Sequence, residues 1–482
     1  MADPLTFLHE SATRLAARIR DRETSSRDIV EAHLAQIDRA NPKLNAMVKK
    51  RFDAARAEAD RVDAKVKGGE PLGPFEGVPC TIKECFELTG MPNSSGLVAR
   101  RAIVAKRDAT AVDRLRKAGA IPMGVTNVSE LCMWMESDNK VYGRTGSAFD
   151  PGRTSGGSSG GEGSMVGAGA SPFGLGSDVG GSIRMPAFFN GVFGHKPTGG
   201  LVPNSGQYPV AEPGPMQRYV VTGPICRRAE DLHPLLKLLA GVDGIDGGAR
   251  DMPIGDPRDV DLRQLTVLDV REKIVWPVSD ELIAAQERAA WVLASRGAKV
   301  KRVRLPRLSS GLEIWSAFMT AGGGPPYAEI LGDGTPVKPG REFLRWIAGR
   351  SPHTLPSIGL AALETVAKAM GDRTDKALSL GRELKAELDD LLDDRTVMLF
   401  APHATVAPKH GHALLPPVKW AYTAVLNPML LPITQVPLGL SRDGLPLGVQ
   451  VVGGEGRDHV TIAVAQELER ALGGWTMPEW LR

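Results

Sequence analysis

Runs of apolar residues along the chain alternate with polar segments in a way that predicts strands separated by helices. Apolar and charged residues recur at helical spacing from residue 4 to 64, and Thr24-Ser25-Ser26 is typical of a helix N-cap. We therefore expect an N-terminal helical region over residues 1–70. Residues 109–119 then predict a helix that ends at a glycine, and residues 121–125 predict a strand.

The second half of the chain returns to the same pattern. Residues 265–305 predict strand, helix and strand, residues 397–400 and 433–436 predict buried strands, and residues 459–472 predict a closing helix. Strands that alternate with helices favour an α/β fold in which helices cover both faces of a mixed, twisted β-sheet.

One segment between these elements is rich in large apolar side chains. Such side chains at helical spacing are usually core, and Gly322-Gly323-Gly324-Pro325-Pro326 predicts a hinge or break among them. The residues concerned are Trp315, Phe318, Met319, Tyr327, Phe343 and Trp346.

Composition and charge exclude several classes of function. The chain has 482 residues and a net charge of +3 from 59 basic and 56 acidic residues, a balance that gives no reason to expect nucleic-acid binding. It contains no apolar stretch long enough to span a bilayer, and its start lacks the apolar core of a signal peptide. We therefore expect no transmembrane segment and a cytoplasmic location.

Two glycine-rich segments carry the candidate chemistry. Gly77–Glu84 ends a predicted buried strand at Lys83, whereas Ser158 and Ser182 both lie in glycine runs. A serine hydroxyl needs a neighbouring base to become a nucleophile, and a buried lysine can serve as that base when it is neutral. Backbone N–H groups in the run Val179-Gly180-Gly181-Ser182 would stabilise the oxyanion. The pattern therefore favours hydrolysis by a serine nucleophile with a lysine base.

Other interpretations of the glycine runs remain open at this point. A Gly-Gly-Ser-Ser-Gly-Gly run is more often a flexible linker, although the apolar segment 164–176 that follows argues against one here. A phosphate-binding loop is a second alternative, but the Gly-x-x-x-x-Gly-Lys-Ser/Thr pattern is missing.

A wider set of motifs resembles the amidase signature family, and within it the type 2 fatty-acid amide hydrolases and bacterial amidases and urethanases. The similarity extends from about Ala12 to the C-terminus. The motifs are Thr126-Asn127, Tyr142-Gly143-Arg144-Thr145, Gly156–Gly163, Gly176–Pro186, Gly194-His195-Lys196-Pro197-Thr198-Gly199, Val406–His410, Pro432–Gly439 and Gly444–Gln450.

The resemblance implies a catalytic triad and a proton relay. Ser182 matches the nucleophile, Ser158 the bridging serine and Lys83 the general base. The bridging serine is expected to follow a cis peptide bond, here Gly157–Ser158. Val179, Gly180, Gly181 and Ser182 match the oxyanion hole. Asp178 and Arg184 are expected to pair and fix the nucleophile loop, rather than to form a solvated ion pair.

The resemblance also places an acyl pocket at Leu131-Cys132-Met133-Trp134-Met135. Cys132, Met133 and Met135 are the expected substrate contacts, and their apolar character favours a hydrophobic acyl group. The implied activity is hydrolysis of carboxylic amides through an acyl-enzyme. Esters, anilides and carbamates (urethane bonds) are further substrates of such relatives.

No cofactor and no metal are expected. Cys80, Cys85, Cys132 and Cys226 are irregularly spaced, and the cluster His403, His410 and His412 matches no common zinc pattern.

Within the same family, a glutaminase subunit of a tRNA-dependent amidotransferase remains the alternative. It requires polar side chains to bind glutamine. The expected organisation is an amidase signature domain over residues 71–482, with a core motif at about 77–225 and a cap-like insert at about 306–395. The resemblance implies that this insert is a substrate cap, in which some of its apolar side chains line a hydrophobic tunnel instead of the core. A homodimer is expected from relatives only.

Overall fold

The strands form one large mixed sheet and one small ribbon in the computed structural model, which describes residues 4–368, 371–412 and 420–482. Residues 369–370 of the predicted cap-like insert therefore lie outside the described residues. The strands are β1 (Met47–Lys50), β2 (Pro79–Lys83), β3 (Ile121–Thr126), β4 (Asp138–Asn139), β5 (Gly143–Arg144), β6 (Phe173–Asp178), β7 (Phe193–Lys196), β8 (Val221–Cys226), β9 (Thr266–Val270), β10 (Lys299–Val303), β11 (Thr396–Phe400), β12 (Ile433–Leu440) and β13 (Pro446–Gly453).

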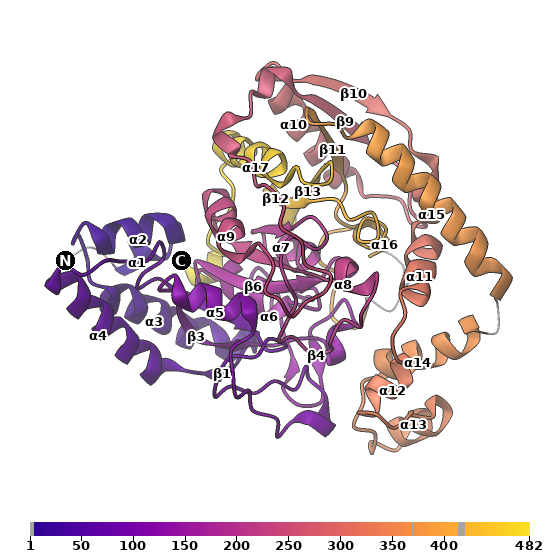
Figure 1. Ribbon diagram of the computed structural model, residues 1–482, viewed down its shortest axis with the longest axis horizontal. Helices are drawn as coiled ribbons and strands as arrows, with labels where there is room; N and C mark the ends of the chain where they lie inside the picture. The colour runs from indigo at the N-terminus through magenta and orange to yellow at the C-terminus, as the bar shows by residue number, and fades with distance from the viewer. Residues whose placement is uncertain (1–3, 369–370, 413–419) are drawn as a thin grey trace.

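Helices cover both faces of the large sheet, as predicted (Figure 1). They are α1 (Pro4–Phe7), α2 (Ala12–Arg20), α3 (Ser26–Leu44), α4 (Phe52–Gly68), α5 (Thr110–Lys117), α6 (Gly160–Gly167), α7 (Arg184–Phe189), α8 (Met216–Tyr219), α9 (Leu232–Leu239), α10 (Asp280–Ser295), α11 (Gly311–Ala321), α12 (Tyr327–Leu331), α13 (Pro339–Ile347), α14 (Leu355–Lys368), α15 (Gly371–Leu391), α16 (Ala421–Ala424) and α17 (Asp458–Leu472).

The sheet order brings the two glycine-rich segments together. The large sheet has 11 strands in the order β1-β3-β2-β6-β8-β7-β12-β13-β11-β9-β10. Strands β2 and β6 are parallel neighbours, with Thr81 opposite Gly174 and Ile82 opposite Leu175. Because parallel strands end at the same edge of a sheet, Lys83 and the loop after Asp178 lie side by side.

The N-terminal region is not entirely helical. Strand β1 lies between α3 and α4 and pairs antiparallel with β3, with Met47 opposite Thr126. The Met47 side chain is only 3% exposed, and its burial holds this short strand at the edge of the sheet. The predicted N-cap is present, since the Ser25 side chain accepts a hydrogen bond from the Asp28 N–H at 3.0 Å.

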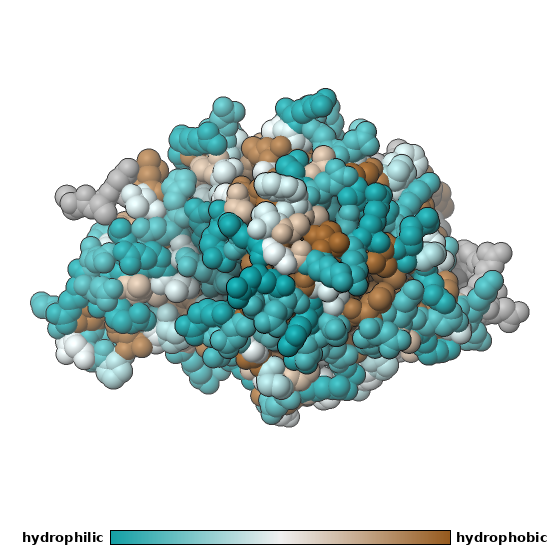
Figure 2. All heavy atoms as spheres, turned by 90° about the horizontal axis from the view of Figure 1, so that it is seen from above, coloured by the Kyte–Doolittle hydropathy of each residue, from teal (hydrophilic) through white to brown (hydrophobic). Residues whose placement is uncertain are grey.

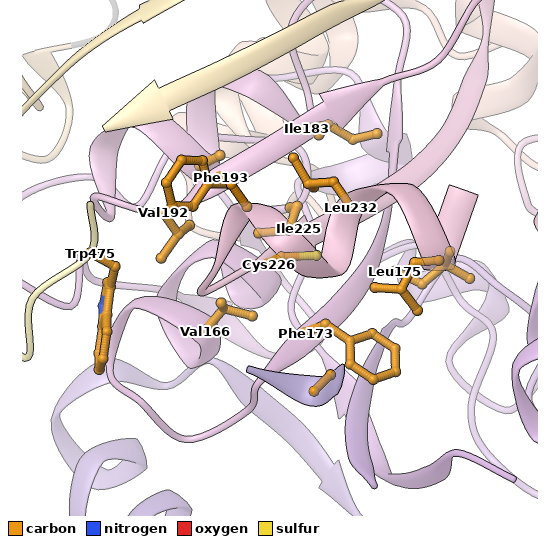
Figure 3. Close-up of a cluster of buried hydrophobic side chains, with 14 of the residues drawn as sticks. Val166, Phe173, Leu175, Ile183, Val192, Phe193, Ile225, Cys226, Leu232 and Trp475 are labelled. Atoms are coloured by element: carbon orange, nitrogen blue, oxygen red, sulfur yellow. The ribbon is translucent and has the colours of Figure 1, made fainter. Parts of the chain in front are cut away.

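A continuous hydrophobic core packs around strands β6 and β8, next to the predicted nucleophile loop (Figure 3). Phe173 and Leu175 on β6 pack with Ile225 on β8, and Ile183 enters the same cluster directly after Ser182. Burying an isoleucine contributes about 2 kcal/mol, so Ile183 anchors one end of the loop.

Residues of the Gly194–Gly199 motif hold the closing helix rather than the site. His195 Nε2 lies 3.1 Å from Asp458 Oδ1 at the start of α17, and its Nδ1 lies 2.9 Å from Thr434 Oγ1. The Thr198 hydroxyl donates to the same carboxylate at 2.6 Å. Because all four side chains are buried, this network fixes β7, β12 and α17 together.

The predicted cap-like insert includes α11 to α15, which lie beside the sheet in Figure 1. Leu331 on α12 and Ala361 on α14 pack on Leu97 and Leu131 of the core motif. A second contact joins the cap to the 3₁₀ turn Glu130–Cys132, because the buried Glu130 carboxylate accepts from the Thr354 N–H at 2.8 Å.

The prediction of core positions is wrong for two residues of this insert. Phe343 and Trp346 on α13 are 45% and 36% exposed, and their rings stack on one another with centroids 6.4 Å apart. The main neighbour of α13 is α14, and this contact leaves Phe343 and Trp346 largely exposed.

The surface seen in Figure 2 is mostly hydrophilic, with apolar residues in small groups. Within the described ranges, no helix combines the length and the apolar composition needed to cross a membrane.

Candidate active site

Lys83 ends strand β2 with its side chain fully buried. Its Nζ lies 2.7 Å from Ser158 Oγ and 2.9 Å from Ser177 Oγ. Ser177 is the second-last residue of β6, the strand beside β2. The lysine amine is therefore held, away from water, between the predicted bridging serine and a strand hydroxyl.

Ser158 lies in the tight loop that precedes α6. The Gly157–Ser158 peptide bond is cis, as the resemblance implied. A Cβ atom at Gly157 would lie 2.3 Å from the Trp134 carbonyl oxygen, so only glycine fits where this loop meets the Leu131–Met135 segment. The Ser158 carbonyl accepts from the Ser137 hydroxyl at 3.1 Å, which fixes the loop on its other side.

Ser182 lies between β6 and α7 and is 8% exposed. Its carbonyl accepts from the Ser159 N–H at 3.3 Å, so the two serine loops are directly joined. Among the described residues, no hydrogen bond joins the Ser182 hydroxyl to Ser158 or to another group, so of the expected relay only the Lys83–Ser158 contact is formed here.

The amides of the predicted oxyanion run differ in what they bind. The N–H groups of Val179, Gly180 and Ser182 donate to no residue in the described part of the chain. The Gly181 N–H instead donates to Asp178 Oδ1 at 2.7 Å, although we expected it to face the oxyanion. The structure therefore leaves the amides of Val179, Gly180 and Ser182 without an acceptor among the described residues, whereas the Gly181 amide is occupied.

The pair Asp178 and Arg184 is buried, with both side chains at 0% exposure. Arg184 donates to both carboxylate oxygens, at 3.0 and 3.1 Å. The same carboxylate accepts from the backbone N–H groups of Gly181 and Ile183, at 2.7 and 3.0 Å. Burial alone would raise the pKa of Asp178, but the Arg184 charge and these hydrogen bonds outweigh it and hold that pKa well below its usual range. The ion pair thus shapes the turn that presents Ser182.

A second buried carboxyl group, which sequence reasoning missed, lies near the lysine. Glu162 on α6 has its two oxygens 2.6 Å from Thr81 Oγ1 and 2.7 Å from Thr126 Oγ1. Burial raises the pKa of Glu162 to about 8, against the opposing effects of the two threonine hydrogen bonds and of Lys83. Glu162 is therefore mostly protonated at neutral pH.

The predicted substrate contacts have different environments. Met135 is buried in the main core at 7% exposure, whereas Met133 packs partly exposed against the cap cluster around Leu97 and Leu331. Cys132 is also partly exposed, and its Sγ lies 3.8 Å from Ser95 Oγ. Both Leu131 and Cys132 have positive φ values, 56° and 58°, which turn the chain sharply at this point.

Several side chains that hold the nucleophile loop come from distant parts of the sequence. Arg184 also donates to the Asn427 amide oxygen at 2.6 Å and to the Gln450 amide oxygen at 2.7 Å. Thr423 on α16 donates to the Gly180 carbonyl at 2.8 Å. Gln450 falls in one of the family motifs, but no sequence signal connects Thr423 or Asn427 to the loop.

The family model described as Amidase matches residues 28–462, so the chain belongs to the amidase signature family. It is an amidase, a hydrolase that acts on amide C–N bonds.

The curated relatives include fatty-acid amide hydrolases. The chain is 45% identical to fatty-acid amide hydrolase 2-B of Danio rerio, over 99% of this chain and 92% of that protein. It is 45% identical to fatty-acid amide hydrolase 2 of Homo sapiens, over 99% and 91%. A solved structure of a glutamyl-tRNA(Gln) amidotransferase subunit from Thermotoga maritima matches with a TM-score of 0.80 and 25% identity, over 99% of each chain.

Proposed function

We propose that this amidase hydrolyses amides of hydrophobic acyl groups through Ser182, Ser158 and Lys83. The observation that carries the proposal is the 2.7 Å contact of Lys83 Nζ with Ser158 Oγ, in a buried position next to the Ser182 loop. A nucleophile needs a base within hydrogen-bond reach, directly or through one intermediate group. The Lys83–Ser158 contact supports the first link of such a relay, and the proposal adds that Ser158 reaches Ser182 Oγ when substrate is bound.

In the proposed reaction, Lys83 accepts the proton of Ser158 as Ser158 accepts the proton of Ser182. Ser182 Oγ then attacks the amide carbonyl carbon, and the negative charge forms on the carbonyl oxygen. Ser158 returns a proton to the leaving nitrogen, which departs as an amine or ammonia and leaves an acyl-enzyme on Ser182. Water then gives a proton to the same relay and attacks the acyl-enzyme carbonyl, and the carboxylic acid is released as Ser182 is restored.

The oxyanion is assigned to the amides of Val179, Gly180 and Ser182. They have no competing acceptor among the described residues, whereas the Gly181 amide is held by Asp178. Donors that are already oriented lower the barrier without reorganising during the reaction.

The substrate class is supported by the surroundings of this loop. The indole of Trp315 lies against Gly180, and the rings of Trp315 and Trp420 meet edge to face with centroids 4.8 Å apart. Met133 adds an adaptable apolar side chain from the predicted pocket segment. These side chains favour an aliphatic or aromatic acyl group, in keeping with the fatty-acid amide hydrolases among the relatives.

Covalent labelling tests the nucleophile. The protein is incubated with an alkyl fluorophosphonate, and the intact mass is measured for wild type, Ser182→Ala, Ser158→Ala and Lys83→Ala. We expect one adduct on wild type, none on Ser182→Ala, and slow labelling of the two relay variants. An adduct of unchanged yield on Ser182→Ala would overturn the assignment, and a Lys83→Ala rate–pH profile equal to wild type would remove the lysine from the relay.

Competition against this labelling then tests the substrate class. The panel is a long-chain primary amide, an anilide, an ester, a carbamate and L-glutamine, each followed by product analysis. The proposal expects the long-chain amide to protect Ser182 and to be hydrolysed. Protection by glutamine alone, together with a copurifying partner chain, would favour the glutaminase alternative, since the fold is common to both kinds of enzyme.

A further inference from the structure

One side chain of the predicted cap holds the backbone of the nucleophile loop. Trp315 is on α11, and its indole N–H donates to the Val179 carbonyl at 2.8 Å. The ring lies against Gly180, where a Cβ atom would be 3.4 Å from the indole carbon Cζ2. Trp315 is partly exposed, so it lies at the wall of the site rather than in the core.

The Val179 carbonyl belongs to the same peptide unit as the Gly180 N–H. A trans peptide unit is planar, and its C=O and N–H bonds point in opposite directions. The hydrogen bond from Trp315 therefore directs the Gly180 N–H away from the indole. This amide is one of the three that donate to no described residue.

The next peptide unit along the loop, between Gly180 and Gly181, is held differently. Its carbonyl, of Gly180, accepts from Thr423 Oγ1 at 2.8 Å, and its N–H, of Gly181, donates to Asp178 at 2.7 Å. That unit therefore has a protein partner at both ends, although the Thr423 hydroxyl lies equally close, at 2.8 Å, to the Trp420 carbonyl. Among the described residues, the Val179–Gly180 unit is held at its carbonyl end only, so its N–H end is left for a ligand.

The two glycines of this loop explain why the Gly180 amide needs a restraint from outside the loop. Gly180 has no side chain to limit its backbone, and Gly181 has a φ of +116°, so this part of the loop is intrinsically permissive. An oxyanion donor is effective only when its direction is fixed before the reaction.

We propose that Trp315 is a positioning residue for catalysis, which orients the Gly180 amide toward the oxyanion through its hydrogen bond to the Val179 carbonyl. The inference rests on the proposed chemistry at Ser182 and goes beyond it, because it makes a side chain of the cap part of the oxyanion site. It also means that the wall of the acyl pocket and the oxyanion geometry depend on one residue.

Two replacements separate the hydrogen bond from the bulk of the ring. Trp315→Phe removes the N–H and part of the ring. Replacement of Trp315 by 3-benzothienylalanine exchanges the N–H for sulfur and keeps the ring size. Trp291→Phe is the matched control, because Trp291 is 71% exposed on α10. Melting temperatures check that all three variants are folded.

The measurements are kcat, KM and the inhibition constant of a long-chain alkyl trifluoromethyl ketone, which forms a charged tetrahedral adduct. We expect kcat to fall about ten- to hundredfold in both Trp315 variants, with KM changed less than about threefold. This loss of kcat is smaller than the roughly hundred- to thousandfold loss that follows removal of a direct oxyanion donor. The inhibition constant of the ketone is expected to rise by the same factor as kcat/KM falls. Trp291→Phe stays at the wild-type values.

A benzothienylalanine variant with wild-type kcat and ketone affinity would overturn the inference, and so would a loss that appears only in KM. The proposed function fails by a different result, namely a wild-type enzyme that neither hydrolyses the amide panel nor is labelled at Ser182. If the wild type is active and labelled at Ser182 but the Trp315 variants behave like wild type, only the role of Trp315 is refuted.

Discussion

Replacing Arg184 by methionine is the sharpest test of how the nucleophile loop is held. Arg184 is fully buried and compensates the charge of Asp178, whose carboxylate in turn binds two amides of the loop. Methionine keeps an unbranched apolar stem but leaves the carboxylate without its cation.

The magnitude follows from the contacts that are lost. Removal of one partner of a buried ion pair destabilises a protein by about 3–5 kcal/mol, because an uncompensated charge stays buried. Arg184 also donates to the Thr423 carbonyl at 2.9 Å and to the side-chain oxygens of Asn427 and Gln450, at 2.6 and 2.7 Å. These acceptors lose their donor as well, so we expect a loss of about 4 kcal/mol at pH 7, with kcat reduced because the loop loses its shape.

The dependence on pH has a definite sign. In wild type the pKa of Asp178 lies below its usual range, so its stabilisation is present above the unfolded-state pKa and is lost as the pH falls through the folded-state pKa. Without Arg184, burial raises the pKa of Asp178, and protonation relieves the variant at acidic pH. The free-energy difference between the two proteins is therefore larger at pH 7 than at pH 5.

Urea unfolding followed by tryptophan fluorescence measures this difference at both pH values. The control is Arg304→Met, since Arg304 is 83% exposed in its pair with Glu272 and is expected to contribute less than about 1 kcal/mol. The double variant Asp178→Asn with Arg184→Met is expected to be more stable than Arg184→Met alone. The reasoning is refuted if Arg184→Met unfolds within about 1 kcal/mol of the control at pH 7.

Two further predictions concern the same region. Gly181→Ala is expected to lower kcat/KM at least about tenfold and to destabilise the protein by about 1–3 kcal/mol, because its Cβ would lie 2.1 Å from Thr423 Oγ1 at a φ of +116°. Gly244→Ala is the control, with a φ of +75° and open space around the Cβ, and equal effects of the two changes on activity would contradict the steric explanation. For Glu162, whose pKa is raised to about 8, wild-type stability is expected to fall as the pH rises from about 5 to 8. Glu162→Gln lacks this titration, so its stability relative to wild type grows over that range, and parallel urea-midpoint profiles would show that the carboxyl group is not protonated in the folded protein.

The local parts of the site are readable from the sequence because their partners lie close together along the chain. Asp178, Gly181 and Arg184 fall within seven residues, and the hydrogen bonds among them close a single turn. The burial of Lys83 is also predictable, because this lysine ends an apolar run that predicts a buried strand. Its position beside Ser177 depends on the parallel pairing of β2 with β6, which no local pattern encodes.

Burial of the cap helices illustrates a limit of periodicity. Helical spacing of apolar residues shows that one side of a helix is apolar, but not whether anything covers that side. Leu331 on α12 is buried by Leu97 and Leu131, whereas Phe343 and Trp346 on α13 remain exposed. The two cases differ in tertiary contacts between residues far apart in the sequence, of the kind that joins Glu130 to Thr354.

The same limit applies to the oxyanion site and explains why its supports are missing from any motif. The amides lie in the glycine run, but the groups that orient their peptide units are Trp315 on α11 and Thr423 on α16. A short glycine loop has little intrinsic preference, so its active geometry must come from whatever packs on it. If Trp315 both lines the acyl pocket and orients the Gly180 amide, as proposed, a change in the cap that alters acyl-group preference is expected to alter kcat together with KM.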